Sequence, residues 1–127
     1  MLTLISGDPG SGKTTLALRR AKQRAKQGHR VCYFDFEGGN QLLVDQHGLF
    51  APRYEQLFVY KPGYSTESVD DITGLATSYN LIVLDGVRAS RLSLAEITLL
   101  YRRLLQTNAS IIIVDFNPST AATYAAT

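Results

Sequence analysis

Five short apolar runs divide the chain, with longer stretches of mixed apolar and polar residues between them. The runs cover residues 2–6, 30–37, 56–60, 80–85 and 110–116. They are rich in Val, Ile, Leu and aromatic residues, and Gly or Pro follows each of them closely. This composition is typical of β-strands. The stretches LIVL and IIIV are apolar at every position, which indicates strands that are buried on both faces.

Helices are expected in the stretches between these runs. Residues 14–28 carry alanine at every fourth position from Ala17 to Ala25 and end at Gly28, a common helix stop. A short helix is expected over residues 41–46. Another is expected to begin with Ser65 or Thr66 as its cap and to place acidic residues in its first turns, where the helix dipole favours them.

The last expected helix has the clearest start signal. Ser93 and Glu96 have the spacing of a capping box. An apolar stripe at helical spacing follows, formed by Ile97, Leu100, Tyr101, Leu104 and Leu105. Strands that alternate with helices predict an α/β fold of three layers, with a parallel sheet of about five strands and helices on both faces.

Composition limits the class of protein. A chain of 127 residues with 45% hydrophobic and 19% charged residues is expected to form one globular domain. We expect the core to span residues 1–118, and residues 119–127 to form a tail with little pattern. The single cysteine, Cys32, fits a reducing cytosol, and no apolar run is long enough to predict a membrane span. The expected location is therefore cytoplasmic.

The net charge of +2 gives no general argument for nucleic acid, but the basic residues are unevenly distributed. Between Asp8 and Asp35 there is no acid, whereas Lys13, Arg19, Arg20, Lys22, Arg24, Lys26 and Arg30 are all basic. We interpret Arg19, Arg20, Lys22, Arg24 and Lys26 mainly as the solvated face of a helix that packs through its alanines. Contact with nucleic acid is the alternative.

The motif GDPGSGKTT carries the strongest functional signal. It matches the pattern G-x-x-x-x-G-K-[ST] and lies between an expected strand and an expected helix, as a phosphate-binding P-loop requires. Glycines let successive backbone N–H groups point at phosphate oxygens, and the helix N-terminus adds partial positive charge. The residues expected to surround the nucleotide are Gly7, Asp8, Pro9, Gly10, Ser11, Gly12, Lys13, Thr14 and Thr15. Lys13 is expected to reach the β- and γ-phosphates, and the Thr14 hydroxyl to ligate Mg²⁺.

A second Mg²⁺ ligand is expected from the strands. Asp85 ends the apolar run LIVLD, which is the setting of a Walker B aspartate. The carboxyl ends of parallel strands lie at one edge of the sheet, so this carboxylate can approach the P-loop. Asp115 competes for the role. We favour Asp85 because its run ends at the acid, whereas the last run continues to Phe116.

Asp35 and Glu37 are expected to lie two residues apart on one face of a strand in YFDFEGG. With the P-loop and LIVLD, this stretch resembles the RecA-like ATPases, the family of recombinases, KaiC-type proteins and ring helicases. The resemblance implies that Glu37 polarises the attacking water and that Asn117, after IIIVDF, senses the γ-phosphate. Alternatively, Glu37 only begins the glycine turn. The resemblance also implies the strand order 1-5-4-2-3.

The resemblance implies Mg²⁺-dependent binding and hydrolysis of ATP, coupled to DNA or to assembly. Small-molecule or nucleotide kinase activity and a nucleotide-dependent binding switch remain alternatives. The segment GVRASRL after Asp85 is shorter than the DNA-contacting loop of recombinases, so we expect a minimal or shortened form of the core. Self-association or a partner protein is expected. The candidates for a cation that completes a neighbour's site are Arg88, Arg91, Arg102 and Arg103.

Overall fold

A computed structural model describes residues 2–7, 12–63 and 68–115. The strands are β1 (Leu2–Ser6), β2 (Val31–Asp35), β3 (Phe58–Pro62), β4 (Leu81–Asp85) and β5 (Ser110–Asp115). The helices are α1 (Lys13–Lys26), α2 (Gln41–Gln46), α3 (Val69–Leu75) and α4 (Leu94–Leu105), with single 3₁₀ turns η1 (Pro52–Tyr54) and η2 (Val87–Ala89).

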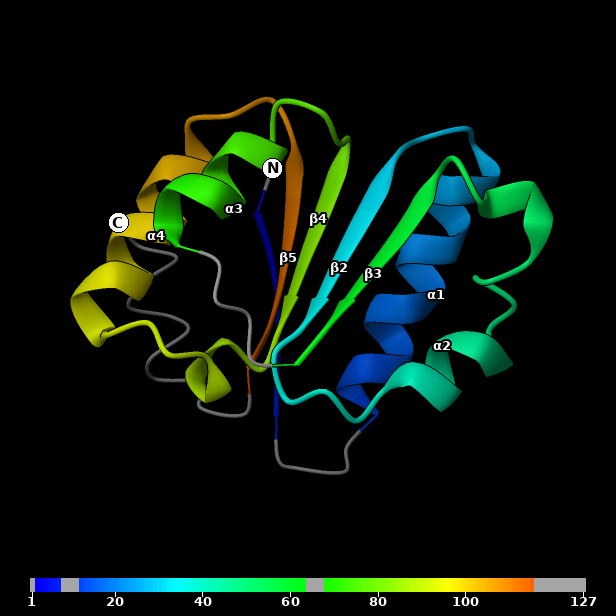
Figure 1. Ribbon diagram of the computed structural model, residues 1–127, viewed down its shortest axis with the longest axis horizontal. Coiled ribbons are helices and arrows are strands. Elements are labelled where there is room, and N and C mark those ends of the chain that lie inside the picture. Colours follow the sequence, from blue (N-terminus) through cyan, green and yellow to red (C-terminus); the bar gives the residue numbers. More distant parts are fainter. Residues whose placement is uncertain (1, 8–11, 64–67, 116–127) are drawn as a thin grey trace.

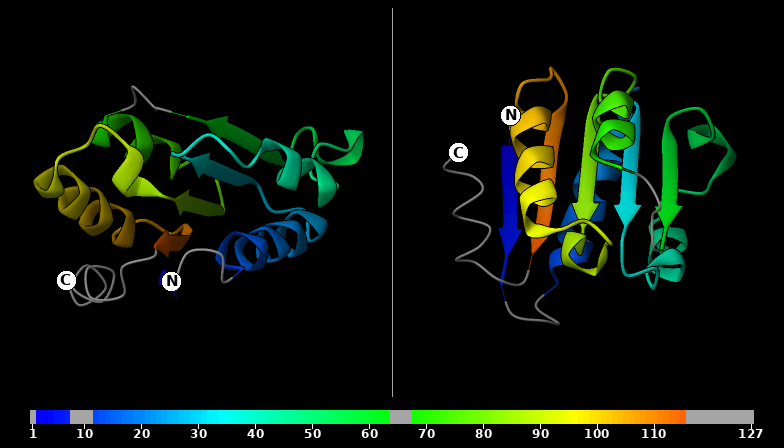
Figure 2. Two further views of the ribbon diagram at one scale, coloured as in Figure 1. Left: turned by 90° about the horizontal axis from the view of Figure 1, so that it is seen from below. Right: turned by 60° about the vertical axis from the view of Figure 1, so that its left-hand side comes forward.

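The strands form one parallel sheet in the order β1-β5-β4-β2-β3, as expected. All the arrows point the same way in Figure 1, so the carboxyl ends of the strands share one edge of the sheet. The two helices α1 and α2 lie on one face of the sheet, and α3 and α4 cover the other (Figures 1 and 2). The predicted three-layer α/β fold is therefore confirmed.

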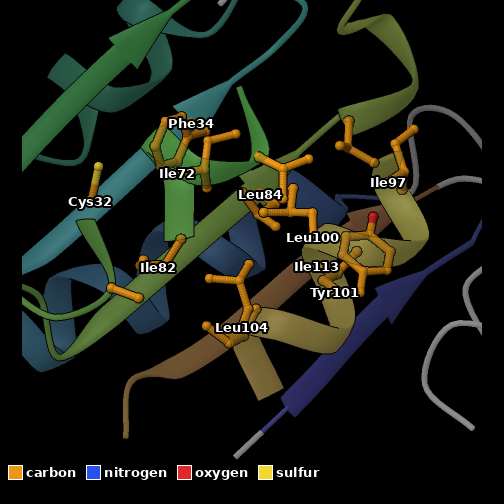
Figure 3. Packing of buried hydrophobic residues seen from close by; sticks show 14 of the residues in the cluster. Cys32, Phe34, Ile72, Ile82, Leu84, Ile97, Leu100, Tyr101, Leu104 and Ile113 are labelled. Atoms are coloured by element: carbon orange, nitrogen blue, oxygen red, sulfur yellow. The ribbon is translucent and has the colours of Figure 1, made fainter. Parts of the chain in front are cut away.

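The core has two layers because the strands are apolar on both faces. Figure 3 shows the layer beneath α3 and α4, where Ile72 and Leu100 pack on Phe34 and Leu84. On the other face the alanines of α1 are at most 1% exposed. Their small side chains bring this helix close to the sheet, and the long basic side chains between them extend outward, with Arg19, Arg20 and Lys26 exposed.

Several element boundaries differ from the expected ones. The second strand ends at Asp35 rather than at residue 37, because Gly38 N–H donates to the Asp35 carbonyl at 3.2 Å and starts a turn. The third strand covers residues 58–62 rather than 56–60. The cap of α3 is Ser68 rather than Ser65 or Thr66, since Ser68 and Asp71 form a reciprocal capping box. The capping box of α4, Ser93 with Glu96, is confirmed.

Cys32 lies in the interior layer beneath α3 and α4 and is fully buried. In the described part of the chain, none of the helices combines the length and the apolar character that crossing a membrane requires. The expected tail, residues 119–127, lies outside the described residues, as does the expected boundary of the core at residue 118.

Candidate active site

The described residues at the two ends of the P-loop motif are in contact. Lys13 Nζ donates a hydrogen bond to the carbonyl oxygen of Gly7 at 2.9 Å. Gly12 precedes α1 with φ of 85°, a left-handed conformation that glycine adopts without strain. The first turn of α1 contains no acidic residue, so nothing on the helix offsets the positive end of its dipole. Asp8, Pro9, Gly10 and Ser11 lie outside the described residues.

Thr14, in the first turn of α1, meets Asp85 at the end of β4. The Thr14 hydroxyl donates to Asp85 Oδ2 at 2.8 Å. Asp85 lies on the α1 face because side chains alternate along β4, and Leu81 and Val83 pack in the layer beneath α1. A hydroxyl and a carboxylate are the oxygen ligands that Mg²⁺ takes, usually with substrate phosphates and water. The donor set therefore fits this metal.

Asp115, the competing carboxylate, lies on the opposite face of the sheet. Side chains alternate along β5, so Ile111 and Ile113 share a face with Asp115. Both isoleucines pack beneath α3 and α4, and Asp115 therefore points away from α1. Its Oδ1 lies 3.6 Å from Arg88 Nε in an ion pair. Strand length does not separate the two aspartates, because β4 ends at Asp85 and Phe116, the residue after Asp115, lies outside the described residues. The face of the sheet does, and it brings only Asp85 to Thr14.

Two side chains that the sequence did not single out contact Asp85. The Tyr33 hydroxyl donates to Asp85 Oδ2 at 2.6 Å, and Asn40 Nδ2 donates to the Tyr33 oxygen at 3.0 Å. Burial and the neighbouring Asp85 raise the pKa of Tyr33, so its hydroxyl stays protonated and donates. Burial also raises the pKa of Asp85, against the lowering effect of hydrogen bonds from Tyr33 and Thr14.

Asp35, which pairs in register with Asp85, supports the turn that carries Glu37. Its carboxylate is 1% exposed and accepts the backbone N–H of Gly38 at 3.0 Å and of Asn40 at 2.8 Å. It also accepts the Tyr60 hydroxyl at 2.7 Å and Asn40 Nδ2 at 3.3 Å. With these donors on both oxygens, Asp35 holds the chain between residues 35 and 40 in place.

Glu37 lies in this turn and is exposed. The expectation that Asp35 and Glu37 share one face of a strand was wrong, because the strand ends between them. The Glu37 side chain instead lies against Gly86, the residue after Asp85: a Cβ atom at Gly86 would be 3.0 Å from Glu37 Cγ. The structure thus brings Glu37 beside the end of β4. Asn117 lies outside the described residues.

The expected arginines are not equivalent. Arg88 pairs with Asp115, and Arg103 pairs with Asp70. Arg91 and Arg102 are exposed and form no ion pair among the described residues. Of the four, these two are the ones whose guanidinium groups the described chain leaves uncommitted.

The described residues contain no cluster of three or more His, Cys, Asp or Glu side chains able to hold a metal ion alone. Two clefts among them have neither Thr14, Asp35 nor Asp85 in their lining. One, of about 320 Å³, borders Arg20, Arg24 and Ser110, and the other, of about 530 Å³, borders Leu42, Asp45 and Phe50. The chemistry described above lies instead at the edge of the sheet where the strands end.

Comparison with known proteins relates this arrangement to established families. Residues 1–115 match the family model described as Nephrocystin 3, N-terminal. Over 90 residues the chain is 32% identical to Protein RecA of Nautilia profundicola, covering 69% of this chain and 25% of that protein. Over 117 residues it is 26% identical to the DNA repair and recombination protein RadB of Methanothermobacter thermautotrophicus, covering 90% of this chain and 48% of RadB. The chain therefore spans less than half the length of these two relatives.

A solved structure shares the fold. The flagellar accessory protein FlaH from Methanocaldococcus jannaschii superposes with a TM-score of 0.70 at 15% sequence identity. The superposition covers 96% of this chain and 65% of FlaH.

Proposed function

Because this chain belongs to the family described as Nephrocystin 3, N-terminal, and folds as a RecA-like P-loop core, we propose that it binds ATP with Mg²⁺ and hydrolyses it. The observation that carries this proposal is the 2.8 Å hydrogen bond from Thr14 to Asp85. This hydrogen bond joins α1, the helix that follows the P-loop, to the end of β4. It brings the Thr14 hydroxyl oxygen and the Asp85 carboxylate oxygen to one place, where both can bind one cation.

Each residue has one task in this proposal. The P-loop and the ammonium group of Lys13 neutralise charge on the β- and γ-phosphates. Thr14 and Asp85 would hold Mg²⁺, which supplies further positive charge to the phosphate oxygens. Asn117 is proposed to contact the γ-phosphate.

Glu37 is proposed as the general base. It accepts a hydrogen bond from a water in line with the γ-phosphate and takes its proton as the water oxygen bonds to phosphorus and the bond to ADP breaks. Its position against Gly86 supports this role, because it places the carboxylate next to the residue after Asp85. The donors around Asp35 make that carboxylate a poor alternative base.

Coupling to DNA is a further part of the proposal. The relatives RecA and RadB support it, since RadB is named a DNA repair and recombination protein. The exposed basic residues of α1 offer contacts to phosphate groups. We also propose that the chain associates with itself or with a partner protein. The dependence of the hydrolysis rate on protein concentration tests self-association.

Binding and turnover can be tested separately. We expect Lys13→Ala to weaken ATP binding by about 1.5–3 kcal/mol, the usual value of a hydrogen bond to a charged group. The exposed Lys26 of the same helix gives the matched control, Lys26→Ala, which should bind as the unmodified chain does. Equal ATP affinity in Lys13→Ala and in the control would remove the P-loop assignment.

Phosphate release with and without single-stranded DNA tests the reaction. Release that rises with DNA supports the coupled hydrolase. If ATP binds but phosphate is not released, two readings replace hydrolysis. Transfer to a small molecule in a phosphorylation screen would indicate a kinase, and no transfer would indicate a binding switch.

A further inference from the structure

The Asp85 carboxylate has an anchor that the proposed reaction does not use. Tyr33 is fully buried on β2, and its hydroxyl donates to Asp85 Oδ2 at 2.6 Å. This is the same oxygen that accepts the Thr14 hydroxyl at 2.8 Å. Tyr33 pairs in register with Val83, two residues before Asp85, so its ring reaches diagonally along the shared face to the end of β4.

The direction of this hydrogen bond is set by Asn40. Asn40 Nδ2 lies 3.0 Å from the Tyr33 oxygen, 3.3 Å from Asp35 Oδ1 and 3.4 Å from Asp85 Oδ2. Since the carboxylate oxygens accept, the Asn40 atom that faces them is the amide nitrogen, which only donates. The Tyr33 oxygen therefore accepts from Asn40, and its own proton is left for Asp85.

We propose that Tyr33 is a positioning residue for the magnesium site: with Asn40 it fixes the orientation of the Asp85 carboxylate that, with Thr14, would hold the cation. This inference rests on the proposed function. Groups that orient a ligating side chain commonly change metal affinity or activity by about 10- to 100-fold when removed. The fixed carboxylate presents its oxygens in one arrangement and does not have to be ordered when the metal binds.

The simpler alternative is that Asp85 only satisfies a buried tyrosine hydroxyl. The chain contains a matched case of that kind. Tyr60 donates to Asp35 Oδ2 at 2.7 Å, and its ring meets that of Tyr33 edge to face at 5.8 Å. Both tyrosines therefore donate to buried carboxylates in one cluster, but only Tyr33 contacts the carboxylate that meets Thr14.

The test compares the affinity for the β,γ-imido analogue of ATP with Mg²⁺ and with EDTA, measured by calorimetry. Electron paramagnetic resonance of Mn²⁺ in the same complex gives a second readout that does not depend on turnover. The variants are Tyr33→Phe and Tyr60→Phe. Tyr79→Phe is the control, because Tyr79 lies before β4 at the other edge of the sheet, where its ring contacts Arg30.

We expect Tyr33→Phe to reduce the gain in affinity that the metal gives by about tenfold or more, and to leave the affinity in EDTA unchanged. Tyr60→Phe and Tyr79→Phe should keep the full gain. If Tyr33→Phe does not fold, Asn40→Ala takes its place, and its gain should fall in the same direction.

A metal-dependent gain in Tyr33→Phe equal to that of the unmodified chain would overturn the inference, as would an equal loss in Tyr60→Phe. If the unmodified chain itself shows no gain with Mg²⁺ or Mn²⁺, the proposed metal site fails and this inference fails with it. The unmodified chain and the variants thus report on the two proposals separately.

Discussion

Individual residues at the carboxyl edge of the sheet owe their chemistry to the face on which they lie. Asp85 and Asp115 both end buried strands, and Asp85 pairs in register with Val114, one residue before Asp115. Residues that pair across two strands point to the same face of the sheet, and a shift of one residue along either strand moves the side chain to the opposite face. Asp85 therefore meets Thr14, whereas Asp115 meets Arg88.

The first prediction at this scale concerns the proposed base. Glu37→Gln keeps the size of the side chain but removes the charge that polarises water. We expect ATP binding to persist and phosphate release to fall by roughly 10²–10⁴-fold. Single-turnover phosphate release measures the change. An unchanged rate would mean that Glu37 only forms the turn and that a group from a neighbouring molecule supplies the base.

The second prediction concerns the residue against which Glu37 lies. Gly86→Ala places a Cβ at φ of 75° and at 3.0 Å from Glu37 Cγ. We expect a stability loss of about 1–2 kcal/mol from the left-handed backbone. A lower hydrolysis rate is also expected, because Glu37 must move.

Gly28→Ala is the matched control for this substitution. Gly28 has φ of 83°, but an added Cβ would have no neighbour within 4 Å. The Gly28→Ala variant should therefore lose about as much stability as Gly86→Ala, while its rate of ATP hydrolysis stays unchanged. Equal hydrolysis by the two variants would show that the contact between Gly86 and Glu37 has no functional role.

The contacts around Asp85 show where sequence reasoning stops at the residue scale. Thr14 and Asp85 were predicted as partners because each belongs to a motif with a fixed place in the fold. Tyr33 belongs to no such motif, although alternation along VCYFD places it on the same face as Asp35. Its contact with Asp85 also depends on which strands are neighbours, and that came from the resemblance rather than from local pattern.

At the scale of the elements, α3 and α4 both begin with a capping box, but only the capping box of α4 is a clear signal in the sequence. Ser93 with Glu96 was predicted, because glutamate is the usual residue at that position. Ser68 with Asp71 was not, because the shorter aspartate is a weaker signal and other hydroxyl residues precede Ser68. Strand ends were misplaced for a related reason: the turn after Asp35 depends on hydrogen bonds from Gly38 and Gly63 that the apolar pattern does not encode.

A pH prediction belongs to α4. Hydrogen bonds from the Ser93 backbone and side chain hold the pKa of Glu96 below its usual value. The resulting stabilisation is present above the unfolded pKa, about 4.3 for glutamate, and is lost as the pH falls through the lower folded pKa. Glu96→Gln cannot titrate there. We expect the unmodified chain to have a higher free energy of unfolding than this variant. The difference should be largest at pH 7 and should shrink as the pH falls toward 3.

Urea unfolding at a series of pH values measures this difference. The exposed Asp71 of α3 offers an independent repeat, because hydrogen bonds from Ser68 lower its pKa in the same way. Asp71→Asn should therefore show the same sign of pH dependence. A difference that stays constant between pH 7 and pH 3 would contradict the capping contribution of these carboxylates.

For the whole molecule, we expect turnover to depend on association. Related nucleotide hydrolases gain about 10³–10⁵ in rate from a cation supplied by a neighbour. We therefore predict slow ATP hydrolysis in dilute solution and a rate per subunit that increases with protein concentration. Light scattering beside the assay relates the rate to the size of the particle.

The arginines can be separated in the same experiment. Arg88 and Arg103 are engaged in ion pairs within the chain, so Arg91→Ala and Arg102→Ala are the first variants to compare. The variant that removes the proposed cation should lose the increase with concentration, while the other keeps it. A rate per subunit that is flat over a hundredfold dilution, with monomers throughout, would reject association as part of the mechanism.

The strand that leads into the P-loop lies at the margin of the sheet, and among the described residues it pairs only with β5. In a parallel edge strand, alternate backbone amides point away from the neighbouring strand. Hydrogen exchange should therefore alternate along β1, slow at the amides that face β5 and fast at the amides between them. If another strand, from this chain or from a partner, paired with this edge, all of these amides would exchange slowly. The exchange pattern of these few amides thus shows whether the edge beside the proposed nucleotide site is covered.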